Sequence, residues 1–190
     1  MYQTLKTLFA TALLVTVAQM AHADDYTETK QVFMNAGESG AYFKNAYGYA
    51  LFPTIGKGGM GIGGAHGSGR VYAGGAHVGD TKMTQLSIGW QLGGQTYSQI
   101  IFFEDKRAFD DFTSGNFEFG AQAAAVAITA SAGASTTTGG GTQTSVAGGK
   151  NDAATSSLGY RKGMAVFTVA KGGLMYEATV AGQKYSYEPK

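Results

Sequence analysis

The chain has 190 residues, a formal net charge of +1 and 14% charged residues, with 30 glycines and no cysteine. A balance this close to neutral excludes a general electrostatic attraction to nucleic acid, so an anionic partner has to be met by a local basic patch. The lack of cysteine excludes disulfides and thiolate metal sites. The 30 glycines, 11 tyrosines and 11 phenylalanines favour a β-rich domain over a helical bundle.

Residues 1–23 have the pattern of a secretory signal. Lys6 precedes an apolar run that ends at Ala18, and Ala21-His22-Ala23 supplies the small residues of a cleavage site. The run is shorter than the roughly 20 residues that a membrane-spanning helix needs. We therefore expect cleavage after Ala23 and export as a soluble periplasmic or envelope-associated protein, not a lipoprotein, whose residues 24–190 form one domain.

Residues 24–46 form the most helix-like stretch of the chain. Apolar and small residues recur there at intervals of three and four, which places them on one helix face: Phe33, Ala36, Gly40, Phe43 and Tyr47. Glycine weakens a helix, so two short pieces that break near Glu38 fit the pattern as well as one helix. This element either packs over a sheet or lies on a membrane surface, with Phe33 and Phe43 as interface anchors.

Strands follow in quick succession. Residues 47–52 and 60–65 flank a turn at Lys57, and a further strand covers residues 69–78. In the clearest strand, residues 85–92, one face carries Leu86, Ile88, Trp90 and Leu92, and the other carries Gln85, Ser87, Gly89 and Gln91. Residues 96–103 end apolar on both faces, which indicates a central strand.

A short helix interrupts the strands after residue 103. Glu104 and Asp105 can cap its first turn, Phe109 and Phe112 then face inward, and Gly115 ends it.

The last third of the chain combines strands with a low-complexity insert. Alternation resumes over residues 117–128, and residues 129–158 are rich in Gly, Ser, Thr and Ala, which predicts a flexible insert. A meander over residues 164–170, 174–181 and 184–187 closes the chain. The predicted fold is α+β and mainly β: an antiparallel sheet system with an N-terminal helix and one short internal helix.

Gly59-x-Gly61-x-x-Gly64 matches the phosphate-binding fingerprint of dinucleotide-binding proteins. That fingerprint needs a helix directly after it and an acidic residue about 20 positions on, and the chain continues instead with glycine-rich strand residues. We expect no nucleotide ligand. The glycines either allow a sharply coiled sheet or leave bare backbone that touches a ligand or membrane.

The residue types argue against catalysis. After signal cleavage only His66 and His77 remain, without cysteine or a dense carboxylate cluster, so we expect neither a metal nor another cofactor. No serine lies in a Gly-x-Ser-x-Gly elbow followed by a suitable acid and histidine. The sequence therefore predicts a protein that is not an enzyme.

Five short motifs occur in an order typical of one family: Tyr49-Ala-Leu-Phe-Pro53, Gly61-Ile-Gly-Gly64, Gln91-Leu-Gly-Gly-Gln95, Ile101-Phe-Phe103 and Lys171-Gly-Gly-Leu174. Over about residues 32–187 the chain resembles the SYLF domain family, a lipid-binding domain also described as an actin regulator. The resemblance implies binding of phosphoinositide-containing membranes and, in some eukaryotic members, of actin. We do not expect actin as a partner in a bacterial envelope.

The function we expect is non-enzymatic binding to an anionic lipid or membrane surface of the cell envelope. The headgroup candidates are Lys57 and Lys171, which occupy equivalent Lys-Gly-Gly turns, together with Arg70, Arg161 and Lys162. Two alternatives stay open: a structural or assembly protein that binds an envelope protein, and a small outer-membrane β-barrel.

Overall fold

The computed structural model describes residues 25–89, 94–120, 123, 125–128, 159–172 and 180–190. The predicted signal (1–23), the predicted insert (129–158), Trp90 and Leu92 therefore lie outside the described residues, as does most of the predicted strand 174–181.

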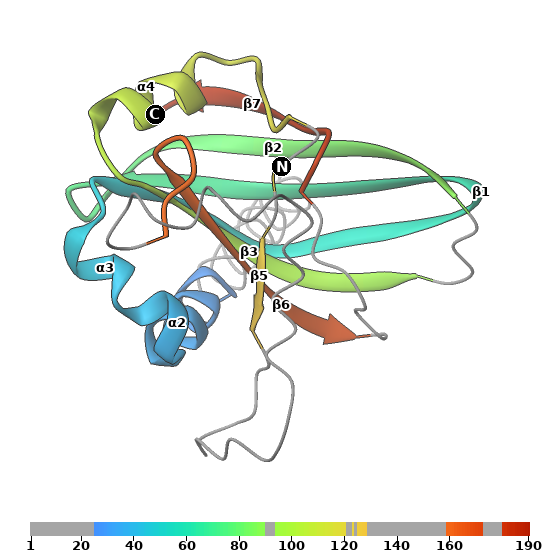
Figure 1. The fold of residues 1–190 in the computed structure, drawn as a ribbon, viewed down its shortest axis with the longest axis horizontal. Helices are drawn as coiled ribbons and strands as arrows, with labels where there is room; N and C mark the ends of the chain where they lie inside the picture. Colours follow the sequence, from blue (N-terminus) through green and yellow to red (C-terminus); the bar gives the residue numbers. More distant parts are fainter. Residues whose placement is uncertain (1–24, 90–93, 121–122, 124, 129–158, 173–179) are drawn as a thin grey trace, which may run out of the picture.

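The described residues build one curled sheet of seven strands in the order β4-β7-β2-β1-β3-β6-β5 (Figure 1). Neighbouring strands are antiparallel except β5 and β6, which are parallel, so the predicted α+β, mainly β fold is confirmed with one parallel pair at an edge. The strands are β1 (Gly48–Ala73), β2 (Ala76–Gly89), β3 (Gln95–Phe103), β4 (Phe117–Glu118), β5 (Val126–Ile128), β6 (Met164–Gly172) and β7 (Gln183–Pro189).

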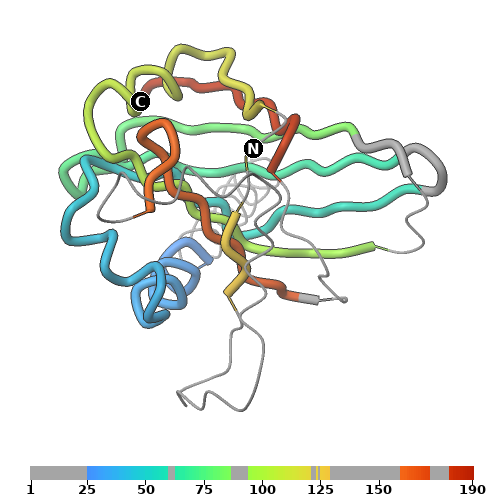
Figure 2. The backbone as a smooth tube through the Cα atoms, in the orientation of Figure 1, coloured from blue at the N-terminus to red at the C-terminus, as the bar shows by residue number. Residues whose placement is uncertain are grey.

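β1 consists of two arms that lie side by side (Figure 2). Residues 48–57 pair with β3, and residues 61–73 pair with β2. Gly59, between the arms, has a φ of 152°, a conformation that glycine adopts readily. A Cβ on Gly69 would lie 2.8 Å from the Leu51 carbonyl oxygen, so the close approach of the arms requires glycine. The predicted hairpin around Lys57 is confirmed.

Both faces of the central strands are covered. The inner face carries Phe52 and Ile101 and packs against β7 and the helix α4 (Lys106–Thr113). The outer face carries Leu51, Ile100 and Phe102 and packs against the N-terminal helices. Figure 1 shows α4 beside β7 and the N-terminal helices on the opposite side of the sheet. β3, buried along most of its length, is the central strand that its apolar run predicts.

The N-terminal helical stretch is divided into residues 25–35, α2 (Gly37–Gly40) and α3 (Tyr42–Asn45), close to the predicted break. Phe33 is fully buried against the outer face, so its predicted role as a membrane anchor is wrong in this fold. The side chain that would enter a membrane is already in the protein core. Phe43 is half-buried, with its ring 4.9 Å from that of Phe102.

The short internal helix is confirmed as α4. Asp105 accepts a hydrogen bond from the Ala108 backbone N–H at 2.8 Å, and Gly115, with a φ of 95°, follows the helix. Phe112 is buried against Phe103 and Tyr185.

Leu86, on the predicted apolar face of its strand, points outward. Leu86 is 87% exposed and Gln85 only 6%, because the Gln85 Nε2 donates a hydrogen bond to the Ala181 carbonyl oxygen at 2.8 Å on the inner side. The alternation is as predicted, and the polar residue is the buried one.

Among the helices of the described residues, none has both the length and the apolar character that crossing a bilayer requires.

Candidate functional site

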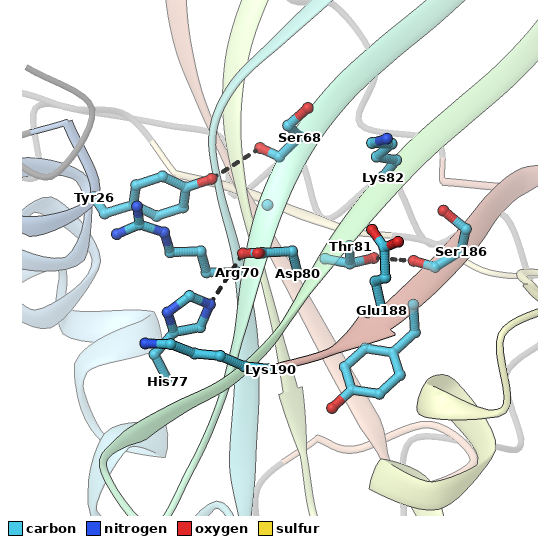
Figure 3. Close-up of a pocket in the computed structure, with 12 residues that line it drawn as sticks. Tyr26, Ser68, Arg70, His77, Asp80, Thr81, Lys82, Ser186, Glu188 and Lys190 are labelled. Carbon is cyan, nitrogen blue, oxygen red and sulfur yellow. Dashed lines mark hydrogen bonds and ion pairs between the residues drawn. The ribbon is translucent and has the colours of Figure 1, made fainter. Parts of the chain in front are cut away.

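A groove lies on the outer face, beside the first turn of the N-terminal helix (Figure 3). It has a volume of about 940 Å³ and is lined by Tyr26 and by side chains of β1, β2 and β7. The helices cover β3, β6 and the first arm of β1. The groove lies next to them, on the second arm of β1 and on β2 and β7. It is therefore a polar continuation of the outer face.

Strand register places the groove residues in two rows. Ser68 of β1 lies opposite Lys82 of β2, which lies opposite Ser186 of β7. In the next row Arg70 lies opposite Asp80, and Asp80 lies opposite Glu188. Val71 and Met83, which directly follow Arg70 and Lys82 along their strands, are buried on the inner face. Period-two alternation therefore aims both rows into the groove.

Arg70 links the groove to the helix. Its guanidinium carbon lies 4.1 Å from the centroid of the Tyr26 ring, a cation–π contact. The Tyr26 hydroxyl donates a hydrogen bond to the Ser68 carbonyl oxygen at 3.4 Å. Burial raises the pKa of Tyr26 to about 12, and the Arg70 charge opposes that rise. Tyr26 is therefore neutral at physiological pH.

The groove holds basic side chains without ionic partners. Within the described part of the chain, Arg70, Lys82 and Lys190 form no ion pair. The carboxylate of Asp80 pairs with His77 Nε2 at 3.0 Å. The same nitrogen lies 3.1 Å from the Gly79 carbonyl oxygen, so it faces two acceptors and carries the proton.

The groove can hold an anion. The unpaired cations supply charge, and the hydroxyls of Ser68 and Ser186 flank Lys82 as hydrogen-bond donors. Asp80 and Glu188 on the neighbouring row disfavour an anion there, so the row of Lys82 is the better position.

Lys57 and Lys171 lie at the same end of the sheet but on different faces. Lys57 follows Ile55 of the inner face by two residues and pairs with Gln95. The Lys171 Nζ donates a hydrogen bond to Thr54 Oγ1 at 3.2 Å. Thr54 directly precedes Ile55 of the inner face, so this bond places the Lys171 side chain on the outer face.

Arg161 and Lys162 precede β6, whereas Lys171 is near its end. A strand rises about 3.3 Å per residue, so the seven residues from Met164 to Lys171 place Lys171 about 23 Å from the turn that holds Arg161 and Lys162. The five predicted headgroup residues do not form one patch, and only Arg70 lies in the groove.

Sequence reasoning missed Tyr26, Ser68, Lys82 and Ser186. The alternation of exposed and buried positions in β2 and β7 marks Lys82 and Ser186 as outward-facing. Nothing local indicates that β2 pairs with β7, about a hundred residues later.

The two histidines have separate environments. His66 is exposed on β1 opposite Thr84, and His77 is held by Asp80. Across the described ranges, no group of three His, Cys, Asp or Glu side chains lies close enough to hold a metal ion.

The curled sheet with its polar groove is the fold of the described residues, and comparison with known proteins assigns its family. The model of the Ysc84 family, described as "Las17-binding protein actin regulator", matches residues 84–188, more than half of the chain. The chain belongs to this family, also called SYLF, which is associated with lipid and protein binding. The match includes Ser186 and begins after Ser68, Arg70 and Lys82.

The chain is also similar to beta cell expansion factor A of Aeromonas veronii, with 29% identity over 104 residues. The alignment covers 55% of this chain and 31% of the relative, so the chain spans about a third of that protein's length.

Proposed function

We propose that this protein is a non-enzymatic module that binds anionic membrane surfaces of the cell envelope through the outer-face groove. The observation that carries the proposal is the set of Arg70, Lys82 and Lys190, three basic side chains in one groove without an ionic partner among the described residues. The family's association with lipid binding supports it. The signal-like pattern of residues 1–23 supports export as the route to that surface.

The expected contact is to a lipid phosphate. Lys82 provides the charge, and Ser68 and Ser186 provide donors on the two neighbouring strands, which lie about 4.8 Å to either side. A basic side chain near an anionic surface contributes roughly 1 kcal/mol, so the three cations together amount to about a hundredfold in affinity. Such binding weakens as salt screens the charges.

Lys57 and Lys171 form a competing contact set, because they share one end of the sheet. Arg161 and Lys162 form a third set in the exposed turn before β6. Phe43, half-buried in α3, is the remaining candidate for an interface contact. These sets are separated from the groove, so variants distinguish them.

The test is co-sedimentation of residues 24–190 with phosphatidylcholine vesicles and with vesicles that also contain phosphatidylglycerol, at low and high salt. We expect binding to the anionic vesicles only, and less at high salt. The double variant Arg70→Glu, Lys82→Glu should lose most of this binding. Parallel variants are Lys57→Glu with Lys171→Glu, and Arg161→Glu with Lys162→Glu.

The matched control is Lys44→Glu with Lys106→Glu, two exposed lysines of α3 and α4 outside the groove. It makes the same change in net charge, so equal loss in this control would show that only total charge matters. Loss confined to the Lys57 and Lys171 variant would move the contact to the end of the sheet. No binding by the unmodified protein would reject lipid binding.

A protein partner in the envelope is the second candidate function. It is favoured by apolar side chains that face solvent, above all Leu86 at 87% exposure. In that case Leu86→Asp would abolish capture of the partner and leave vesicle binding unchanged.

A further inference from the structure

A cluster of polar side chains is buried inside the curl of the sheet, on the face opposite the groove. It consists of Tyr97 and Gln99 of β3, Thr168 of β6, and Gln183 and Tyr185 of β7. All five are buried, in the middle of the apolar cluster of the inner face. Buried polar groups usually have all their hydrogen bonds satisfied.

Most of the cluster is internally bonded. Gln99 Nε2 donates to Gln183 Oε1 at 3.0 Å and to the Tyr185 hydroxyl at 2.8 Å. Gln183 Nε2 donates to the Tyr97 hydroxyl at 3.2 Å, and the Tyr185 hydroxyl donates to Gln183 Oε1. These bonds hold both glutamine side chains in one orientation.

Two side-chain oxygens of the cluster have no hydrogen-bond partner among the described residues. Gln99 Oε1 and Thr168 Oγ1 are buried and form no hydrogen bond with any described residue. Gln99 is 0% exposed and Thr168 is 1% exposed. The two residues are direct partners in the pairing of β3 with β6. Direct antiparallel partners point to the same face with Cβ atoms about 5 Å apart, so the two side chains that carry these oxygens are neighbours on the inner face.

We propose that this position binds a neutral hydroxyl group from outside the chain, supplied by a water molecule or by an alcohol of a small ligand. Gln99 Oε1 only accepts, so the guest must donate a proton to it. Thr168 can donate in return to the guest oxygen. An anion is rejected because Gln99 Oε1 would repel it. The site therefore takes a neutral hydrogen-bond donor, whereas the groove takes an anion. The proposal does not depend on the proposed membrane binding.

The inner face becomes exposed close to the site. Towards the end of β6, the next inner-face position after Thr168 is Ala170, which is exposed. Beyond Tyr97 the inner face continues to Gln95 and the half-buried Lys57. The site thus lies one inner-face position from a residue in contact with solvent.

Thr168→Val tests the proposal, because it replaces the hydroxyl by a methyl group of the same shape. If the hydroxyl is bonded to a guest, the variant loses that bond and Tm falls by about 2–4 °C. If the hydroxyl is buried without any partner, its removal leaves Tm unchanged or raises it, which would overturn the proposal.

Thr81→Val is the matched control. Thr81 is also buried in a strand, and its Oγ1 donates to the Ser186 carbonyl oxygen at 2.7 Å, so the loss of a known bond sets the scale for the fall in Tm.

A second measurement identifies the guest. Native mass spectrometry of the protein isolated from its own cells detects an added mass if a ligand supplies the hydroxyl. Rotating-frame NOEs from a long-lived water to the Thr168 methyl group detect a water. Either signal, absent from Thr168→Val, supports the site. The absence of both would overturn it even if Tm falls.

Discussion

The guanidinium of Arg70 packs on the ring of Tyr26, with 4.1 Å between its carbon and the ring centroid. In a second cation–π contact the cation comes from the helix and the ring from the sheet: the Lys30 Nζ lies 5.8 Å from the centroid of the Tyr49 ring. The first helix is thus attached to β1 by two cation–π contacts in addition to the buried Phe33. Arg70 contacts both the helix and the groove. We therefore expect that an anion which displaces Arg70 from the Tyr26 ring weakens the attachment of the first helical turn to β1.

Tyr26→Ala should therefore speed amide hydrogen exchange over residues 25–35 by about two- to fivefold, which corresponds to the roughly 0.5–1 kcal/mol of a cation–π contact. Tyr26→Phe is the control, because it keeps the ring and loses only the 3.4 Å hydrogen bond to Ser68. Equal acceleration in both variants would show that the hydroxyl, not the ring, holds the helix.

Phe33→Ala should lower the free energy of unfolding by about 3–5 kcal/mol, because it empties a fully buried position. Val32→Ala, one residue earlier and 41% exposed, should cost far less. Urea denaturation measures both. A small effect of Phe33→Ala would mean that the helix is not docked in solution, and would return Phe33 to the list of membrane anchors.

Asp105→Ala should destabilise the protein by about 1 kcal/mol, because it removes the acceptor of the Ala108 N–H at the start of α4. Asp110→Ala removes only an exposed pair with Lys106, which solvent screens, so it should destabilise the protein less than Asp105→Ala. Comparison of the two urea midpoints checks the order.

Gln85→Ala should destabilise the protein by about 1 kcal/mol through the lost hydrogen bond to Ala181. Leu86→Ser should change stability by less than about 0.5 kcal/mol, because Leu86 is 87% exposed. Thermal unfolding of both variants tests which face of β2 is buried. The reverse order of effects would place Leu86 inside.

Stability should fall between about pH 10 and pH 12. Burial raises the pKa of Tyr97 to about 12, although its hydrogen bond with Gln183 lowers it somewhat. The unfolded chain loses the same proton near pH 10.0, the ordinary pKa of tyrosine, so the stabilisation is complete below that pH and disappears towards the folded pKa. Two pKa units correspond to roughly 2–3 kcal/mol.

Urea midpoints of the unmodified protein and of Tyr97→Phe, measured from pH 9 to pH 12, test this. The variant should show a shallower decline, and the slope is compared because the variant also loses a hydrogen bond. Equal slopes would show that Tyr97 does not titrate with a raised pKa.

Much of the fold follows from local patterns. Period-two alternation and apolar runs predict β3 and β6, and Asp105 with Gly115 predicts both ends of α4. The intervals from Phe33 to Phe43 predict the N-terminal helical stretch, and of the predicted face Phe33 is the residue that is fully buried. These signals are readable because they act between residues a few positions apart.

The candidate site follows from the sequence only in part. Arg70 is predictable as a basic residue of a strand, but its partners Tyr26 and Lys82 come from other elements. Lys57 and Lys171 have equivalent turn motifs, yet they emerge on different faces of the sheet. A bulge near Thr54 shifts the register of β1 and so resets which side chains face inward.

The sequence by itself determined the near-neutral charge, the β-rich composition, the α4 cap and the motifs of the SYLF family, because each depends on residue type or short spacing. Tertiary structure alone decided the rest. Pairing of β2 with β7 and of β3 with β6 joins segments about a hundred and about seventy residues apart. Those contacts form because the sheet curls to bury its inner face. They place Ser186 beside Lys82 and Thr168 beside Gln99.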